Sequence, residues 1–271
     1  MTFLTDFGST DNYVGVVKGA ILSIAPDARV VDLTHSVPPQ DILRGAFLIG
    51  SAWQTFPFGT IHLAVVDPGV GTKRRPILLW GHGHYFIGPD NGLFTQVLFP
   101  EFMQRQPGKK LFEPLTKALP SGFNGAIPDK EEFWRRPTST TFHARDVFGP
   151  IAAYLATGTP PWRFGTPLKS LVTLYTPAAE RTRQSVNGYV LHIDTYGNII
   201  TNIRHKDLPS DRVLVTIGKH TILGLNDTYG TARGLTTLIS GEGLLEVALR
   251  NGSAAKRLNA QIGTPVVVTA N

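Results

Sequence analysis

The sequence contains no cysteine, and none of its hydrophobic runs is long enough to cross a bilayer. Without thiol groups the protein can form neither disulfide bonds nor thiolate metal sites, and it has no cysteine nucleophile. A transmembrane helix needs roughly 18 to 20 consecutive apolar residues, so we expect no membrane partner. The opening segment MTFLTDFG predicts a strand and a turn, without the charged and apolar regions of a signal peptide. The expected location is therefore the cytoplasm.

Charged residues make up only 17% of the 271 residues, with 26 Lys and Arg against 20 Asp and Glu. The formal charge of +6 fits either an anionic partner or simply a basic surface. The basic aromatic segment FWRRP, residues 133–137, is not surrounded by any recognised nucleic-acid-binding module. We therefore expect no nucleic-acid partner. A hydrophobic content of 42%, with 28 Gly and 20 Pro, predicts a globular chain with many tight turns.

The first half of the chain has the pattern of an α/β domain. Short apolar strands are expected at residues 3–4 and 30–33, and the segment between them, YVGVVKGAILSIAPDA, has apolar residues at helical spacing. A second strand–helix–strand unit follows, with DILRGAFLIGSAWQTF as the helix and TIHLAVVD as the next strand. Near-continuous apolar strands of this kind suit a sheet that is covered on both faces. We therefore predict a mostly parallel central sheet.

The second half of the chain has a different pattern. Residues 100–140 are rich in Pro, Gly and charge without a clear period, and we interpret them as a long surface excursion. After the helical segment DVFGPIAAYLATG and a Pro-rich stretch at residues 157–167, short alternating segments are separated by closely spaced turns. This pattern favours a small β-barrel or sandwich. The predicted α/β domain is residues 1–165, and the smaller, all-β, barrel-like domain is residues 183–271, with the boundary between residues 160 and 187.

Polar residues at strand ends are the first candidates for function, because ligands bind outside the carboxyl ends of strands in open α/β sheets. Asp6 ends the first predicted strand, and Asp11 lies near the start of the next helix, where it can bind a ligand or merely cap the helix. A carboxylate at the end of a first strand can accept both hydroxyls of a ribose, but the phosphate-binding pattern G-x-G-x-x-G is missing. The pair therefore favours a nucleoside without phosphates.

A third carboxylate, Asp67, ends the strand TIHLAVVD. The following Pro68 and Gly69 let the chain turn back, so that Arg74 can return towards Asp67. For these residues alone, a turn-stabilising ion pair is the simpler interpretation. His143, in the segment TFHARD, precedes the last predicted helix of the α/β domain. A single histidine is more often structural than catalytic, so His143 alone decides nothing.

Six sequence segments place these residues in a common context. In chain order they are TDFGSTDNYVGVVKGAI, VDLTHSVPPQDI, VVDPGVGTKRR, GPDNGL, TFHARD and DTYGNIITNI. Together they resemble the successive motifs of the S-adenosyl-L-methionine (SAM) hydroxide adenosyltransferases, a family related to the fluorinase and chlorinase enzymes. The resemblance extends more weakly through GLLEVALRNGSAA and covers nearly the whole chain except residues 100–138. It implies hydrolysis of SAM to adenosine and L-methionine by a homotrimer whose substrate lies between neighbouring subunits.

The resemblance also implies roles for the polar residues of the α/β domain. Asp67, Arg74 and His143 match a set that holds a water or hydroxide against the C5′ carbon of the substrate ribose. The spacing in the family favours Arg74 over the adjacent Arg75. Arg74 can stabilise hydroxide character, and either Asp67 or His143 can accept the proton.

No metal and no redox cofactor is expected. The leaving group of the implied reaction is a neutral thioether, which needs no protonation. His82 and His84 lie two residues apart on a predicted hairpin, but two ligands alone do not make a metal site.

The resemblance further implies a set of substrate-binding residues. They are Asp6 for the ribose hydroxyls, Asp11 and Asp194 for the methionine amino group, Asn198 for the adenine edge, and Tyr196 and Tyr229 for packing on adenine. Structural roles stay open for three of them, with Tyr196 and Asn198 as turn residues and Tyr229 as a core residue. Glu242 departs from the family pattern, because an acid repels the methionine carboxylate that the family binds in this region.

Two other functions compete with hydrolysis. A halogenase would bind halide, but where the halogenating relatives carry Tyr, Thr and Ser this sequence has Asp67, Val70 and Ala144. A carboxylate at position 67 would repel a halide ion. A non-catalytic nucleoside-binding or sensing protein would have no need of Asp67, Arg74 and His143 together. The sequence therefore favours hydrolysis.

Overall fold

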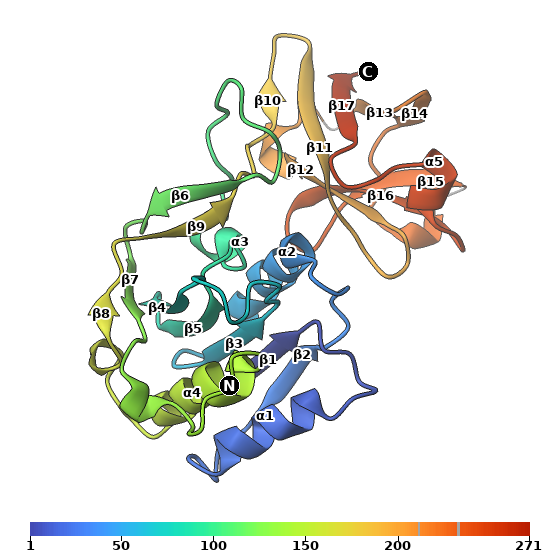
Figure 1. The fold of residues 1–271 in the computed structure, drawn as a ribbon. Helices are drawn as coiled ribbons and strands as arrows, with labels where there is room; N and C mark the ends of the chain where they lie inside the picture. The colour runs from blue at the N-terminus through green and yellow to red at the C-terminus, as the bar shows by residue number, and fades with distance from the viewer. Residues whose placement is uncertain (211, 232–233) are drawn as a thin grey trace. The chain divides into compact units, whose positions relative to one another are not determined.

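The computed structural model describes residues 1–210, 212–231 and 234–271, and the chain divides into two compact units. The first unit consists of Met1–Pro100 and Phe112–Tyr175, and the second of Glu101–Leu111 and Thr176–Asn271. Figure 1 shows helices and strands in the first unit and mainly strands in the second. The predicted fold class, an α/β region followed by an all-β region, is confirmed.

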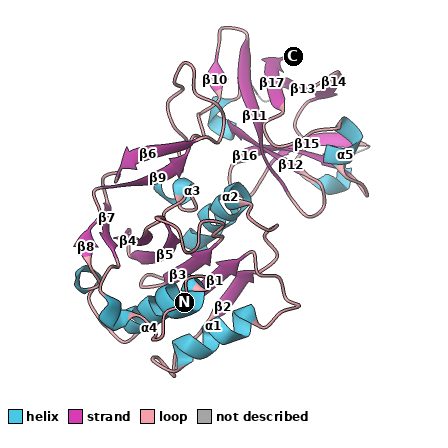
Figure 2. Cartoon of the chain, viewed as in Figure 1, coloured by secondary structure: helices cyan, strands magenta, loops and turns pink. Residues whose placement is uncertain are grey.

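A seven-stranded sheet forms the centre of the first unit (Figure 2). Its strands, in the order in which they pair, are β2 Val31–Thr34, β1 Thr2–Thr5, β3 Ile61–Val65, β5 His84–Pro89, β4 Pro76–Gly81, β7 Phe123–Ile127 and β8 Thr166–Pro167. Strands β2, β1, β3 and β5 pair in parallel. Strand β7 runs in the same direction as β5, because both pair antiparallel with β4. The prediction of a mostly parallel sheet is confirmed.

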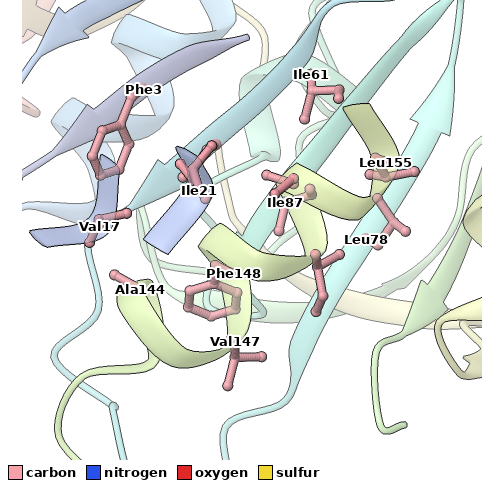
Figure 3. Close-up of a cluster of buried hydrophobic side chains, with 14 of the residues drawn as sticks. Phe3, Val17, Ile21, Ile61, Leu78, Ile87, Ala144, Val147, Phe148 and Leu155 are labelled. Carbon is pink, nitrogen blue, oxygen red and sulfur yellow. The ribbon is translucent and has the colours of Figure 1, made fainter. Parts of the chain in front are cut away.

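Helices cover both faces of this sheet. Their bounds are α1 Tyr13–Leu22, α2 Ile42–Ala52, α3 Thr95–Leu98 and α4 Gly149–Ala156, with a π-helical turn at Ala144–Phe148 and 3-10 turns at Trp53–Thr55, Glu131–Phe133 and Pro161–Arg163. Because alternate strand residues point to opposite faces, Phe3 packs in the core with α1 and α4 (Figure 3), whereas Leu4 packs in the core with α2 and α3. In the described parts of the chain, no helix has both the length and the apolar character required to span a membrane.

The second unit is built on an eight-stranded antiparallel sheet. The strands are β10 Glu180–Arg181, β11 Ser185–Ile193, β12 Ile199–Arg204, β13 Val213–Ile217, β14 His220–Leu223, β15 Leu235–Ile239, β16 Leu244–Leu249 and β17 Pro265–Ala270, with helix α5 at Ala254–Leu258 and 3-10 turns at His205–Asp207 and Tyr229–Thr231. The terminal strands of the sheet, β14 and β15, lie against each other. The sheet is therefore nearly closed around one apolar core, as the barrel-like prediction requires.

The interpretation of residues 100–140 as a surface excursion is wrong. Strand β7 belongs to the main sheet, and β6 (Pro114–Ala118) pairs with β9 (Ser170–Leu174) in a separate ribbon. Residues 101–111 belong to the second unit, where the backbone N–H of Met103 donates to the carbonyl of Thr176 at 2.9 Å. Each of these partners lies far along the chain, so no local period marks the segment.

Close packing between strands gives a first test. In Gly88→Ala the added Cβ would clash with the carbonyl oxygen of Ala64 in neighbouring strand β3, and overpacking of this kind costs about 1 to 3 kcal/mol of unfolding free energy. Gly19→Ala is the matched control. In helix α1 its Cβ would meet nothing within 4 Å, so it should stabilise the protein by about 0.5 to 1 kcal/mol. Urea unfolding measures both, and a Gly88→Ala variant as stable as the original chain would contradict this packing.

Candidate active site

Asp67 lies just beyond the carboxyl end of β3, at the start of a tight turn. The N–H of Val70 donates to the Asp67 carbonyl at 3.3 Å, and Gly71 has a φ of 76°, which favours glycine. A Cβ at Gly71 would also clash with the carbonyl oxygen of Thr140. Only glycine therefore lets this turn approach the segment that leads to His143. The expectation that the chain doubles back after Asp67 is confirmed.

The turn brings Arg74 into a bidentate ion pair with Asp67. Nε of Arg74 donates to Oδ1 of Asp67 at 3.0 Å, and Nη2 donates to Oδ2. Each side chain is only 6% exposed. Nη2 also lies 3.2 Å from Nδ1 of His143. Arg74 therefore contacts both Asp67 and His143, although Arg74 and His143 are 69 residues apart in the sequence.

Three further residues hold this cluster, and the sequence analysis assigned none of them to the site. Nδ2 of Asn91 donates to the carbonyl of Val66 at 2.8 Å and fixes the backbone directly before Asp67. The ring of Phe148 lies 5.3 Å from the guanidinium carbon of Arg74, within the range of a cation–π contact. Asp146, which is completely buried, accepts from the N–H of Ser139 at 2.8 Å and closes the segment that carries His143. The segment GPDNGL contained the signal for Asn91, but its role requires the fold.

The electrostatics of the cluster disfavour charge on two of its members. Burial raises the pKa of Asp67, and the Arg74 guanidinium opposes this shift. Burial and then the Arg74 cation lower the pKa of His143, while Asp67 and Asp146 act in the opposite direction. Nη1 of Arg74 is buried and has no hydrogen-bond partner among the described residues. The cluster therefore offers a fixed cationic donor beside two groups that can accept a proton.

The adjacent Arg75 has a different task. Its Nε donates to Oδ2 of Asp90 at 3.0 Å, and its Nη2 donates to the carbonyl of Ser170 at 2.9 Å. Asp90 also accepts from the N–H of Val172 at 2.7 Å. Arg75 thus ties the loop after β5 to β9, and Arg74 alone belongs to the candidate site.

Asp6 and Asp11 follow β1 at the same edge of the sheet. Because Thr5 pairs with Val65 in the parallel β1–β3 ladder, Asp6 and Asp67 leave neighbouring strands at the same end. Oδ2 of Asp6 accepts from the N–H of Gln40 at 2.8 Å. Asp11 is exposed, and α1 has Asn12 at its N-cap without a side-chain cap hydrogen bond. The alternative in which Asp11 caps the helix is therefore wrong. No hydrogen bond within the described chain joins Asp6 or Asp11 to Asp67, Arg74 or His143.

The four candidates of the second unit line one cavity of about 660 Å³. These candidates are Asp194, Tyr196, Asn198 and Tyr229. Gly230 and residues 249–252 also line the cavity. Oδ1 of Asp194 accepts from the backbone N–H of Asn198 at 2.8 Å, and Oδ2 accepts from its Nδ2 at 3.0 Å. The positive φ of this turn falls on Gly197. The left-handed residue of this turn is therefore Gly197, whereas Asn198 closes the turn through its hydrogen bonds to Asp194.

Tyr229 reveals a residue that the sequence analysis missed. Its hydroxyl donates to Oε1 of Glu246 at 2.7 Å, and Glu246 is only 4% exposed. Burial is the main reason why the pKa values of both groups are raised. Tyr229 is 47% exposed and is not a core residue, and Tyr196 is 80% exposed in its turn. The signal for Glu246 was present as the one acid in the apolar segment LLEVAL.

Other expectations concern metals and Glu242. No group of three or more potential metal-ligating side chains occurs in the parts of the chain that the structure describes. His82 and Gly83 form the predicted hairpin turn between β4 and β5, with positive φ values of 49° and 77°. Glu242 is exposed, and its N–H donates to Oγ of Ser240 at 3.3 Å.

Fold and site together define a class of two-part proteins, with a buried carboxylate–guanidinium–imidazole cluster in an α/β unit and an aromatic, carboxylate-lined cavity in a β-barrel unit. Two family models match the chain. The model described as SAM hydroxide adenosyltransferase N-terminal domain matches residues 1–165, and the model for the C-terminal domain matches residues 188–267. The chain therefore belongs to the SAM hydroxide adenosyltransferase family, and the resemblance seen in the sequence is confirmed.

Individual relatives agree with this assignment. The chain is 39% identical to an (R)-S-adenosyl-L-methionine hydrolase from Thermus thermophilus, over 97% of each chain. It is 27% identical to a fluorinase from Actinopolyspora mzabensis, over 99% of this chain and 96% of the relative. A crystal structure of an uncharacterized conserved protein from Thermotoga maritima superposes with a TM-score of 0.85 at 31% identity, over 99% of each chain. The hydrolase is thus more similar to this chain than the fluorinase is.

The contact between Arg74 and His143 is testable without substrate. His143 should titrate below the ordinary histidine pKa, and Arg74→Gln should raise its pKa, because the cation is lost while the nearby carboxylates stay. NMR titration of the imidazole resonances measures both values. Arg75→Gln is the matched control and should leave His143 unchanged, since Arg75 bonds Asp90 instead. An equal effect of the two substitutions would contradict the arrangement.

Proposed function

We propose that this protein hydrolyses SAM to adenosine and L-methionine, with the oxygen of a water or hydroxide displacing the thioether at C5′. The observation that carries the proposal is the contact of His143 with the buried ion pair of Asp67 and Arg74. Family membership and the hydrolase names of full-length relatives support it. The protein is accordingly an adenosylmethionine hydrolase that forms adenosine.

The bond changes explain which groups the reaction needs. The C5′–O bond forms as the C5′–S bond breaks, and the electron pair of that bond goes to sulfur, so the positive sulfonium becomes the neutral thioether of methionine. The protein must therefore supply and align a nucleophile. Nη1 of Arg74 is a buried donor that can orient the attacking oxygen. Asp67 and His143 are the two groups of the cluster that can accept its proton.

The substrate contacts extend the proposal to both units. Asp6 accepts hydrogen bonds from the ribose hydroxyls, and Asp11 contacts the amino group of methionine. In the barrel cavity Asp194 contacts the same amino group, Asn198 contacts the adenine edge, and the aromatic rings of Tyr196 and Tyr229 pack on adenine. Support comes from the edge of the sheet that Asp6 shares with Asp67 and from the cavity that the other four residues line.

The two competing functions have less support. Ala144 is buried and offers no hydroxyl to a halide, and the carboxylate of Asp67 repels it. A non-catalytic nucleoside-binding protein leaves the buried ion pair of Asp67 and Arg74 without a purpose. The proposed reaction uses no metal, no redox cofactor, no nucleic acid and no membrane, and we expect it in the cytoplasm.

Isotope labelling tests the proposed reaction. In oxygen-18 water the label should appear at the 5′ oxygen of adenosine and not in methionine, because the attack is on carbon, and mass spectrometry of both products measures this. Asp67→Asn provides a second test. It should lower turnover by about 10²-fold or more, as loss of a positioned proton acceptor does. Unlabelled adenosine, label in methionine, or full activity of Asp67→Asn would refute the mechanism.

We further propose a homotrimer whose sites are completed by a neighbouring subunit. The support is that the candidate residues are divided between the two units. The Pro-rich stretch at residues 157–167, expected to connect the two halves, lies within the first unit and adds no support. A closed ring with one type of interface gives three equivalent sites.

Mixed oligomers test this assembly. Asp67→Ala and Asp194→Ala should each be inactive alone, and an equal mixture after subunit exchange should recover activity at about a quarter of the sites, since each neighbour is intact in the required half with even chance. Light scattering gives the oligomeric state, and product formation gives the recovery. A fully active monomer, or no recovery in mixed trimers, would place the whole site within one chain.

A further inference from the structure

A second cavity, of about 610 Å³, lies in the first unit and contains none of the candidate site residues. Its walls are largely aromatic and include Trp53, Phe56, Phe58, Phe123, His82 and His84. Phe58 is 87% exposed, and its ring lies 5.9 Å from that of His84. A volume of a few hundred cubic ångströms with apolar walls and few polar groups is typical of small-molecule sites.

The cavity lies at the amino end of the parallel strands, whereas the candidate active site lies at their carboxyl end. His62 and His84 stand near the amino ends of β3 and β5, whereas Asp67 follows the carboxyl end of β3. Five residue steps from His62 to Asp67 separate the two places by roughly 16 Å along the strand. The proposed hydrolysis therefore leaves this cavity without a role.

A buried hydrogen-bonded chain leads into the cavity. Oγ1 of Thr2 lies 2.8 Å from Nδ1 of His62, and Nε2 of His62 lies 3.1 Å from Nδ1 of His84. Thr2 and His62 are completely buried. Burial lowers the pKa of His62 to about 3, and burial followed by the neighbouring His82 lowers the pKa of His84. Both imidazoles of the chain are therefore neutral, with one N–H each.

The buried threonine fixes which nitrogen carries each proton. His62 is the only partner of the Thr2 hydroxyl among the described residues, so the hydroxyl must donate to Nδ1 to avoid an unpaired buried donor. His62 then carries its proton on Nε2 and donates to Nδ1 of His84. His84 in turn carries its proton on Nε2. This remaining N–H belongs to a residue that lines the cavity and has no partner among the described residues.

We propose that this cavity binds an uncharged, planar aromatic heterocycle that accepts a hydrogen bond from Nε2 of His84. Aromatic walls favour stacked and edge-on contacts with a flat ring. The fixed N–H can donate a hydrogen bond to a ring nitrogen or a carbonyl oxygen, but not to a ring without an acceptor. Because His62 and His84 are neutral, this hydrogen-bonded chain provides no charge to hold an anion.

Benzimidazole and indole form a matched probe pair, since they share size and shape but only benzimidazole has an acceptor nitrogen. Without adenosine or SAM present, benzimidazole should bind this cavity about five-fold more tightly than indole, the value of one neutral hydrogen bond. Ligand-detected NMR measures both dissociation constants. His84→Phe keeps an aromatic ring without the N–H and should abolish the difference.

Substitutions at two exposed aromatic residues test whether the probes bind in this cavity or elsewhere on the surface. Phe58→Ala should weaken both probes several-fold, because it removes a wall of the cavity. Trp162→Ala, at a residue that is 68% exposed and lies outside the cavity, should change neither. Both substitutions are at the surface and leave the core intact. The proposal is overturned if indole binds as tightly as benzimidazole, if neither binds at millimolar concentration, or if Phe58→Ala has no effect.

Discussion

The buried ion pair between Asp67 and Arg74 is the constraint on which the candidate site of the first unit depends. Both side chains are almost fully removed from water, and the lost hydration offsets most of their mutual attraction. A pair of this kind is therefore a weak source of stability. Nevertheless a glycine turn, the Asn91 amide, the Phe148 ring and the Asp146 anchor all act to hold it or its neighbour His143. Because the ion pair contributes little stability although several residues hold it in place, we infer that it has a chemical role.

Local periodicity explains how much of the fold the sequence could predict. The strands β1 and β3 and the helices α1 and α2 bury regular apolar positions, so their pattern is visible in a short window. Residues 100–138 lack this signal for physical reasons. Strand β6 pairs with β9, whose residues lie more than fifty positions later, and β7 contains Gly125, where a Cβ would lie 3.0 Å from Leu168. A glycine that packing requires lowers the apparent strand propensity of the segment.

The clustering of three candidate residues was predictable from the segments in which they stand. Asp67, Arg74 and His143 lie in segments that resemble motifs of the family, and the structure brings Arg74 into contact with the other two. Asn91 and Glu246 were missed because their roles depend on partners distant in sequence, a backbone carbonyl for Asn91 and the Tyr229 hydroxyl for Glu246. Hydrogen-bond geometry of that kind appears only in the folded chain.

The electrostatic character of the cluster suits the proposed reaction. A nucleophile with hydroxide character and a sulfonium carry opposite charges, and both charges disappear as the products form. A transition state that is less charged than its reactants gains relative to them when water is excluded. The pair of Asp67 and Arg74 is little exposed, and burial and the Arg74 cation favour the neutral form of His143. The cluster can therefore orient the oxygen through Arg74 without holding its negative charge so firmly that attack on carbon is slowed.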